Sequence, residues 1–294
     1  MSSNRQREND PIAPHRRRLL GLAYRMLGSR SDAEDVVQDA YLRFIGTENV
    51  RNPEAFLVTV VTRLCLDRLK SARAQREIYV GPWLPEPVFD TDGLSTEVAT
   101  ELADDLSFAL LLALDRLSPQ ERAAFLLHDV FDISFSEIAA MIGRSEPACR
   151  QLAARARRAV RDERPPPAAA DSHAHLLQAF LVAVTSGDLS RLTGLLRDDA
   201  VAVTDGGGRK TAALNPIYGA DKIARFFISV AGKAAGRDIR IEAPVINGSA
   251  GALLYMDGEL DHSLSISIDG ERIAAIYLVR NPDKLRHAPG QPRS

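Results

Sequence analysis

Cysteine is scarce in this sequence: Cys65 and Cys149 are the only two among 294 residues, and both stand inside helical patterns. Two isolated cysteines provide neither the spacing of a metal-binding cluster nor a disulfide framework. The pattern favours a protein of a reducing compartment, so we expect a cytoplasmic location. We expect no metal ion and no cofactor.

Long apolar runs are also missing. The longest, "FALLLAL" at Phe108–Leu114, is far shorter than the roughly 20 residues that a helix needs to cross a bilayer. The first ten residues, "MSSNRQREND", contain no apolar segment of the kind found in a signal peptide. We therefore expect neither secretion nor contact with a membrane.

Basic residues are absent from one long stretch. Between Gly81 and Asp115 there is no Lys or Arg, while the stretch contains Glu86, Asp90, Asp92, Glu97, Glu101, Asp104, Asp105 and Asp115. The formal net charge is −2, although a protein that holds DNA unaided is usually basic. Basic residues gather instead in Arg63–Arg76 and Arg150–Arg164, so the distribution of charge leaves nucleic-acid binding open.

The sequence patterns divide the chain into five segments. Two segments are helical, a third alternates between helical and strand patterns, and proline-rich spacers separate them. We predict a multidomain protein with a helical domain at 12–77, an acidic linker at 78–94, a helical domain at 95–163, a Pro/Ala linker at 164–171 and an α+β domain at 172–285.

Local signals fix several helix ends. Gly28 is placed to end the first helix, and "SDAE" at Ser31–Glu34 has the form of a capping box that starts the next. Asn52 and Pro53 are typical of the N-cap and first turn of a third helix. In the second helical domain, Ser118–Glu121 and Ser134–Glu137 repeat the capping-box pattern.

The segment from Ser134 to Arg158 has the spacing of a helix-turn-helix. Small Ala139 allows a close helix crossing, Gly143 suits the left-handed turn, and Ser145 can cap the second helix. That helix has an apolar stripe on one face, and Arg and Gln side chains on the opposite face, which suit contacts with bases and phosphates. The alternative is an amphipathic surface helix with solvated arginines.

Taken in order, the segments resemble a bacterial sigma factor of the extracytoplasmic-function (ECF) group. "HRRRLLGLAYRMLGSRSDAEDVVQDAYLRF" (His15–Phe44) resembles the part that binds core RNA polymerase. Asn52–Glu77 resembles the part that opens and binds the −10 promoter element, and Leu117–Arg161 the part that binds the −35 element. In such a protein the polymerase supplies most phosphate contacts, which accounts for the modest net charge.

The resemblance implies three sets of binding residues. The surface facing the β′ clamp helices would contain Asp32, Glu34, Asp35, Gln38, Asp39 and Leu42, the alternative being a solvated acidic face. Contacts with the −10 element, including a pocket for a flipped base, would come from Asn49, Arg51, Asn52, Arg63, Arg68 and Lys70. Contacts with the −35 element would come from Ser145, Glu146, Ala148, Arg150, Gln151, Arg155 and Arg158. The second helical domain would also contact the β flap.

The last domain shows helical patterns at 174–185, 189–196 and 221–230, followed by alternating segments that Gly and Asn-Gly turns separate. These predict an α+β fold ending in a meander. The loop "DGGGRK" at Asp205–Lys210 is predicted to connect a hairpin between "AVAVT" and "TAAL". A phosphate-binding loop is disfavoured because Arg209 stands where such a loop needs Gly.

This domain resembles the SnoaL-like family, a cone-shaped α+β barrel, through "GDLSRLTGLLRDDAVAVTDGGG", "YGADKIARFF" and "VINGSAGALLYMDGE". The ECF sigma factors that have such a domain also share three short signatures. Here they are the linker residues Trp83, Leu84, Pro85, Glu86 and Pro87, the loop residues Asp205, Gly206, Gly207, Gly208, Arg209 and Lys210, and the tail residues Asn281, Pro282, Asp283, Lys284 and Leu285.

We predict that the three signatures meet in space and that the domain regulates the factor in cis. The lone Trp83 needs an apolar partner to bury its ring. In the family a single basic residue follows the glycines of this loop. Because Arg209 is inserted here before Lys210, the sequence leaves open which of the two makes the contact of that basic residue. The domain could also enclose a small ligand, and the candidate polar lining residues are Tyr218, Tyr255, Asp257, Glu259 and His262. In such a pocket His262 could form an acid–base pair with Asp257 or Asp261. His173 and His175 are expected at the surface.

We therefore predict an alternative sigma factor, a non-enzyme that binds core RNA polymerase and promoter DNA. A second possibility is a one-component regulator that uses only the helix-turn-helix, with the SnoaL-like domain as a small-molecule sensor. That alternative leaves the helix after Asn52 and the acidic helix after Ser31 without a role.

Overall fold

The computed structural model describes residues 13–89, 106–163 and 170–291, apart from the side chains of 72–77, 163 and 170. These residues form two compact units: 13–75 with 113–163, and 76–89 with 106–112 and 170–291. Much of the predicted acidic linker, from Asp90 to Asp105, and residues 164–169 of the Pro/Ala linker lie outside the described residues. Within the described chain, no helix combines the length and hydropathy that a bilayer span requires.

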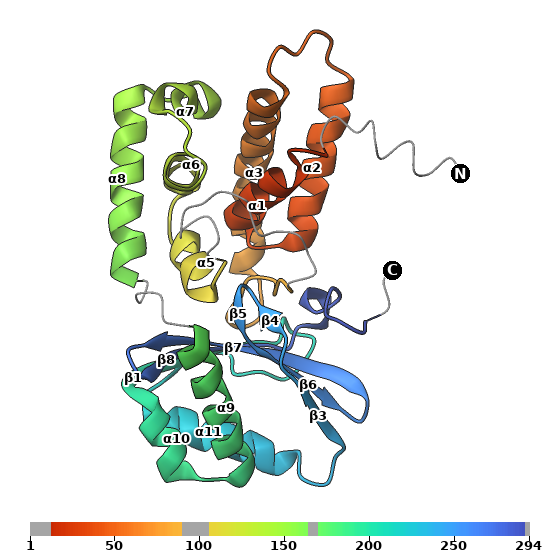
Figure 1. Cartoon of the computed structure of the whole chain (residues 1–294), viewed down its shortest axis with the longest axis vertical. Helices are drawn as coiled ribbons and strands as arrows, with labels where there is room; N and C mark the ends of the chain where they lie inside the picture. Colours follow the sequence, from red (N-terminus) through yellow and green to blue (C-terminus); the bar gives the residue numbers. More distant parts are fainter. Residues whose placement is uncertain (1–12, 90–105, 164–169, 292–294) are drawn as a thin grey trace, which may run out of the picture. The chain divides into compact units, whose positions relative to one another are not determined.

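The first part of unit one contains three helices, α1 (Arg16–Leu27), α2 (Arg30–Ile45) and α3 (Pro53–Glu77) (Figure 1). Gly28 ends α1 in the left-handed conformation at φ 70°, as predicted. Asn52 accepts the Ala55 N–H at 3.1 Å and so starts α3. The predicted capping box at Ser31–Glu34 is wrong: α2 begins two residues earlier, because Ser29 accepts the Asp32 N–H and serves as N-cap.

The second part of unit one contains α6 (Pro119–Phe125), the π-helical turn η2 (Leu126–Val130), α7 (Phe135–Ile142) and α8 (Glu146–Glu163). Both predicted capping boxes form, at Ser118 with Glu121 and at Ser134 with Glu137. Gly143 is left-handed at φ 67°, and Ser145 Oγ accepts the Ala148 N–H at 3.4 Å. The predicted helix-turn-helix is therefore confirmed as a fold element, formed by α7 and α8.

Unit two is built on a six-stranded mixed sheet with the order β2-β1-β8-β7-β6-β3. Its strands are β1 (Leu196–Asp205), β2 (Ile217–Tyr218), β3 (Ile239–Glu242), β6 (Ala252–Met256), β7 (Glu259–Asp269) and β8 (Arg272–Val279). Strands β6, β7 and β8 form the predicted antiparallel meander, whereas β1 pairs with β8 in parallel. A small second sheet joins β4 (Val245–Ile246) to β5 (Ser249–Ala250).

Three helices cover one face of this sheet: α9 (Ala170–Ser186), α10 (Leu189–Leu195) and α11 (Ala220–Lys233) (Figure 1). Their core includes fully buried Phe180, Ile223 and Ile276. The helical domains and the α+β domain confirm the predicted fold class, including the SnoaL-like architecture of the C-terminal part.

The opposite face of the sheet is covered by segments from elsewhere in the chain. Leu84 and Phe89 of the linker pack there, together with Phe108 at the start of α5 (Phe108–Asp115). Phe108 stacks on Tyr277 of β8 with ring centroids 5.3 Å apart. Leu285 from the C-terminal tail completes this cluster. The linker and tail are thus part of the domain's second hydrophobic core.

Two local predictions in this domain are wrong. The glycine loop is not followed by a strand at "TAAL", because the residues that pair with β1 are Ile217 and Tyr218 of β2. His173, expected at the surface, is buried, with Nε2 3.0 Å from the Ile266 carbonyl oxygen of β7. Burial lowers the pKa of His173 below its usual value, and the hydrogen bond to the Ile266 carbonyl offsets only part of this decrease.

This lowered pKa gives a prediction about pH. A histidine buried in its neutral form stabilises the fold above the pKa of the unfolded chain, near 6.5, and that stability is lost as the pH falls from there toward the folded pKa. Urea unfolding at pH 7.5 and 5.5 is expected to show a smaller pH dependence for His173→Gln than for the unaltered chain. His175→Gln, an exposed control on the same helix, is expected to behave like the unaltered chain; an equal effect there would contradict the prediction.

Candidate functional site

The acidic face predicted to contact polymerase lies on α2. Asp32, Asp35, Gln38, Asp39 and Leu42 are exposed there and Glu34 is half-buried, while Ala33, Val36, Val37 and Ala40 form the buried stripe. Leu42 keeps 55% of its surface exposed on the same face as these carboxylates. An apolar side chain among carboxylates provides both parts of a protein-binding surface, steering charge and burial.

Arg68 of α3 lies against this acidic face. Its guanidinium is 3.0 Å from Asp32 Oδ1, 3.5 Å from Asp35 Oδ2 and 4.0 Å from Asp39 Oδ2. The sequence assigned Arg68 to DNA and the carboxylates to polymerase, whereas the structure joins the two sets. Arg68 therefore holds α3 to α2 in the free chain.

The predicted −10 residues occupy the loop before α3 and the exposed side of that helix. Asn49 is exposed with φ of 60°, and Arg51 and Asn52 are also exposed. Arg63 donates from Nε to the Met141 carbonyl at 3.1 Å and from Nη2 to the Ala140 carbonyl at 3.2 Å, so it caps the end of α7.

Lys70, another of the predicted −10 residues, forms an ion pair with Asp67 one turn earlier on α3. The distance from Lys70 Nζ to Asp67 Oδ1 is 2.8 Å, and both side chains are exposed. The hydrogen bond from Lys70 lowers the pKa of Asp67.

The predicted −35 face of α8 is exposed as the periodicity implied. Arg150, Gln151, Arg155 and Arg158 point outward, while Leu152, Ala156 and Val160 are buried. Arg150 pairs with Glu146 one turn earlier and lies 5.0 Å from the centroid of the Phe135 ring. Arg155 donates to Glu121 Oε1 of α6 at 2.9 Å. These contacts hold Arg150, in the first turns of α8, and Arg155, near its middle, on the exposed face of the helix.

The three signatures of unit two meet at the side chain of Asp205, which is fully buried at the end of β1. Its carboxylate accepts the Tyr79 hydroxyl at 2.6 Å, the Leu84 N–H at 2.9 Å and the Lys284 ammonium at 2.6 Å. We call Tyr79, Leu84, Asp205, Asn281 and Lys284 the linker junction. It joins the linker, the glycine loop and the tail around one carboxylate.

Lys284 makes the widest set of contacts at the linker junction. Its Nζ also donates to the Leu84 carbonyl at 2.5 Å, and it lies 4.3 Å from the centroid of the Trp83 ring. The sequence predicted an apolar partner for Trp83, and the structure shows this cation stacked on its ring. Such a contact is worth more where water is excluded.

Glycine is required at the loop for steric reasons. A Cβ on Gly207 would lie 2.2 Å from Asn281 Nδ2 and 2.8 Å from the Tyr79 hydroxyl, and Gly207 has φ of 57°. Asn281 Nδ2 itself donates to that hydroxyl at 2.9 Å. The loop backbone thus approaches both the tail and the linker more closely than any side chain would allow.

The structure also separates the roles of the two basic residues after the glycines. Arg209 lies 3.4 Å from Asp283 in the tail. Lys210 turns the other way, with Nζ 3.3 Å from Asp261 Oδ1 on β7. The residue that contacts the tail is therefore Arg209, although the sequence alone left this open.

Two residues that the sequence reasoning missed hold the linker to unit two. One is Tyr79; burial and its hydrogen bond to Asp205 raise the pKa of its hydroxyl. The other is Asn247, buried, with φ of 53°. Asn247 Oδ1 accepts the Val88 N–H at 3.1 Å and its Nδ2 donates to the Leu106 carbonyl at 2.8 Å. The Asn247-Gly248 pair indicated only a turn.

The candidate pocket residues of the C-terminal domain are dispersed. Tyr218 is exposed, and Tyr255 is buried on the sheet face that carries the linker. Asp257 pairs with Arg237 at the surface. Of the two suggested partners of His262, Asp261 is the one in contact, with Oδ2 2.8 Å from Nδ1.

Comparison with known proteins adds independent information. A family model described as Sigma-70 region 2 matches residues 12–75, and one described as Sigma-70, region 4 matches residues 107–160. The chain is 37% identical over 293 residues to the ECF RNA polymerase sigma factor SigJ of Mycobacterium tuberculosis, a similarity that covers 93% of this chain and 92% of that protein.

The similarity extends to a second relative and to a solved structure. The probable ECF RNA polymerase sigma factor SigI of Mycobacterium tuberculosis is 31% identical over 291 residues, covering 95% of this chain and 96% of that protein. The crystal structure of the Mycobacterium tuberculosis extracytoplasmic function sigma factor SigJ matches with a TM-score of 0.77 at 36% identity, covering 93% of this chain and 96% of that chain.

Proposed function

Because this chain belongs to the ECF RNA polymerase sigma factors, we propose that its SnoaL-like domain regulates it in cis through the linker junction. Sigma factors bind core RNA polymerase and promoter DNA and are not themselves enzymes. A one-component regulator is not favoured, because such a protein has no use for the region 2 match at residues 12–75. A partner of RNA polymerase works in the cytoplasm.

The acidic face of α2 is the surface proposed for the β′ clamp helices. Its carboxylates and exposed Leu42 suit a basic partner with an apolar patch. We propose that the second helical part binds the β flap and places α8 in the major groove at the −35 element. The loop 47–53 and the exposed residues of α3 are proposed to bind the −10 element.

Arg150→Ala is expected to weaken transcription specifically at promoters with the preferred −35 sequence. A side chain that contacts a base with two hydrogen bonds is worth about 1–3 kcal/mol of discrimination. The measurement is run-off transcription with purified core RNA polymerase on two templates that differ only in the −35 element. We expect the preference between the templates to fall by roughly 5- to 150-fold.

Arg157→Ala is the matched control for this experiment. Arg157 stands on the same helix with similar exposure, but it pairs with Asp129 of η2 at 2.6 Å. Its loss should leave the template preference unchanged. A uniform loss on both templates for Arg150→Ala would instead assign that side chain to a phosphate.

The support for regulation in cis is that unit two holds the linker between the two sigma regions. Leu84 and Phe89 are buried in the second core, and the Leu84 N–H and carbonyl are bonded to Asp205 and Lys284. A linker held in this way cannot at the same time extend along a channel of the polymerase. The junction therefore opposes assembly of the active complex.

Loosening the linker junction tests this proposal. Run-off transcription from one promoter should increase when a junction contact is removed and the domain stays folded. Unchanged output from such a variant would show that the junction only completes the fold. The most informative substitution is Lys284→Met.

A further inference from the structure

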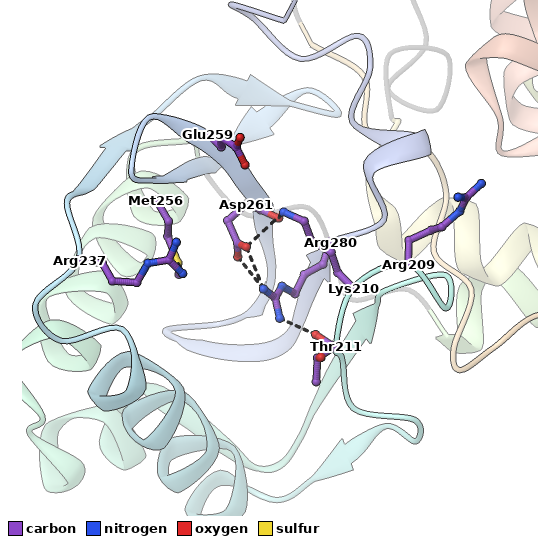
Figure 2. A pocket seen from close by; sticks show the side chains of 8 residues that line it. All are labelled: Arg209, Lys210, Thr211, Arg237, Met256, Glu259, Asp261 and Arg280. Atoms are coloured by element: carbon purple, nitrogen blue, oxygen red, sulfur yellow. Dashed lines mark hydrogen bonds and ion pairs between the residues drawn. The ribbon is translucent and has the colours of Figure 1, made fainter.

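A pocket of about 380 Å³ opens on the C-terminal domain (Figure 2). Its volume lies at the lower end of the range for small-molecule sites. It is lined by Arg209, Lys210, Thr211, Arg237, Met256, Glu259, Asp261 and Arg280. None of these eight side chains belongs to the surfaces proposed to bind promoter DNA or RNA polymerase.

The inner end of the pocket contains two cations that share one carboxylate. Arg280 Nη2 lies 2.8 Å and 3.0 Å from the two oxygens of Asp261, and Lys210 Nζ lies 3.3 Å from Oδ1. Arg209 and Arg237 are matched elsewhere, by Asp283 and Asp257. Figure 2 shows Arg209 pointing away from the other lining side chains.

His262, the remaining neighbour of Asp261, does not supply a further charge at neutral pH. Burial lowers the pKa of His262, and the bond to Asp261 only partly opposes this. Burial by itself would raise the pKa of Asp261, but hydrogen bonds from His262 and Arg280 lower it well below its usual value. One carboxylate therefore faces two cations, which leaves one positive charge unmatched at this end.

An apolar strip adjoins the charged end. Met256 lines the pocket, and its cross-strand partner on β3 is Ile239. Ile241 is paired in the same way with Leu254, and directly paired residues have side chains on the same face of a sheet. Ile239 and Ile241 remain 42% and 38% exposed, so this strip faces solvent and continues from Met256 of the pocket lining.

We propose that this pocket binds a small organic monocarboxylate, with its carboxylate on Lys210 and Arg280 and its apolar body along Met256 and Ile239. A single negative charge matches the single unmatched positive charge. The exposed Glu259 at the rim disfavours a second negative charge, such as that of a phosphate dianion. A neutral alcohol would leave the second positive charge beside Asp261 unmatched.

The occupied pocket would act on the linker junction, a step that rests on the proposed function. Lys210 ends the glycine loop, and its N–H donates to the Gly206 carbonyl at 3.1 Å. The N–H groups of Arg280 and Asn281 donate to the Asp205 carbonyl at 2.7 Å and 3.0 Å. Both carboxylate-binding residues are therefore bonded to the backbone that forms the junction.

Isothermal titration calorimetry of the full chain with butyrate, decanoate and salicylate tests whether the pocket binds monocarboxylates. We expect saturable one-to-one binding of decanoate, and at least ten-fold weaker binding by Lys210→Met and by Arg280→Gln, which equals about 1.4 kcal/mol. Arg225→Gln is the control, because Arg225 is exposed and pairs with Asp221 on α11, outside the pocket. Decanol and inorganic phosphate at the same concentrations are expected not to bind.

Ile239→Glu provides a variant that does not disturb buried charges. Because Ile239 is already exposed, the fold should tolerate the change, while the new carboxylate should weaken decanoate binding at least five-fold. Absence of binding by all three carboxylates, equal binding of phosphate, or equal loss in Arg225→Gln would each overturn the proposal. If decanoate binds but does not change run-off transcription, the binding site is supported and the proposed coupling between the site and the linker junction is refuted.

Discussion

Replacing Lys284 with methionine is expected to free the linker from the C-terminal domain and to increase promoter-specific run-off transcription. The substitution leaves the fully buried Asp205 carboxylate without its cation, and removing one partner of a buried ion pair costs about 3–5 kcal/mol. Hydrogen exchange of the Leu84 amide, which is bonded to Asp205, should therefore accelerate by at least about a hundred-fold.

Two controls make this result specific. Lys222→Met removes an exposed lysine of α11 in the same domain and should change neither exchange nor transcription. In the double variant Asp205→Asn with Lys284→Met, the uncompensated charge is gone, so part of the protection should return. Faster exchange throughout β6, β7 and β8 would mean that the domain had unfolded, and the interpretation would then fail.

Replacing Asn247 with glycine is expected to release the two linker segments that this side chain joins. The backbone at φ 53° suits glycine without strain, and the change removes the side-chain bonds to the Val88 N–H and the Leu106 carbonyl. Leaving a buried polar group unpaired costs about 1–3 kcal/mol. Exchange of the Val88 amide should accelerate by roughly 5- to 150-fold, with a smaller increase in transcription than Lys284→Met gives.

Asp257→Gly is the matched control for Asn247→Gly. Asp257 has nearly the same backbone geometry, with φ of 52°, and also precedes a glycine in a turn. Its side chain pairs with Arg237 and does not contact the linker. If Asp257→Gly accelerated exchange at Val88 as much as Asn247→Gly, the effect would come from turn flexibility and not from the lost amide bonds.

Local signals in the sequence predicted local structure well. Ser118 with Glu121, Ser134 with Glu137, and Asn52 all cap the helices they were assigned to, because a cap involves residues only three positions apart. The error at Ser31 has a simple origin: Ser29 and Ser31 are both able to cap, and the choice depends on how α2 packs. His173 was misplaced because its partner, Ile266, is 93 residues away.

The sequence by itself determined the family, the two helical sigma regions and the residues of the three signatures, since these depend on residue types at short spacings. The tertiary structure alone decided which partners those residues have: that Arg209 contacts the tail while Lys210 faces Asp261, that Lys284 covers Trp83, and that Asn247 joins Val88 to Leu106. The physical reason is that these contacts join segments as far as about 200 residues apart. Sheet pairing and burial bring such segments together, and no local pattern encodes which carboxylate or carbonyl will be within reach.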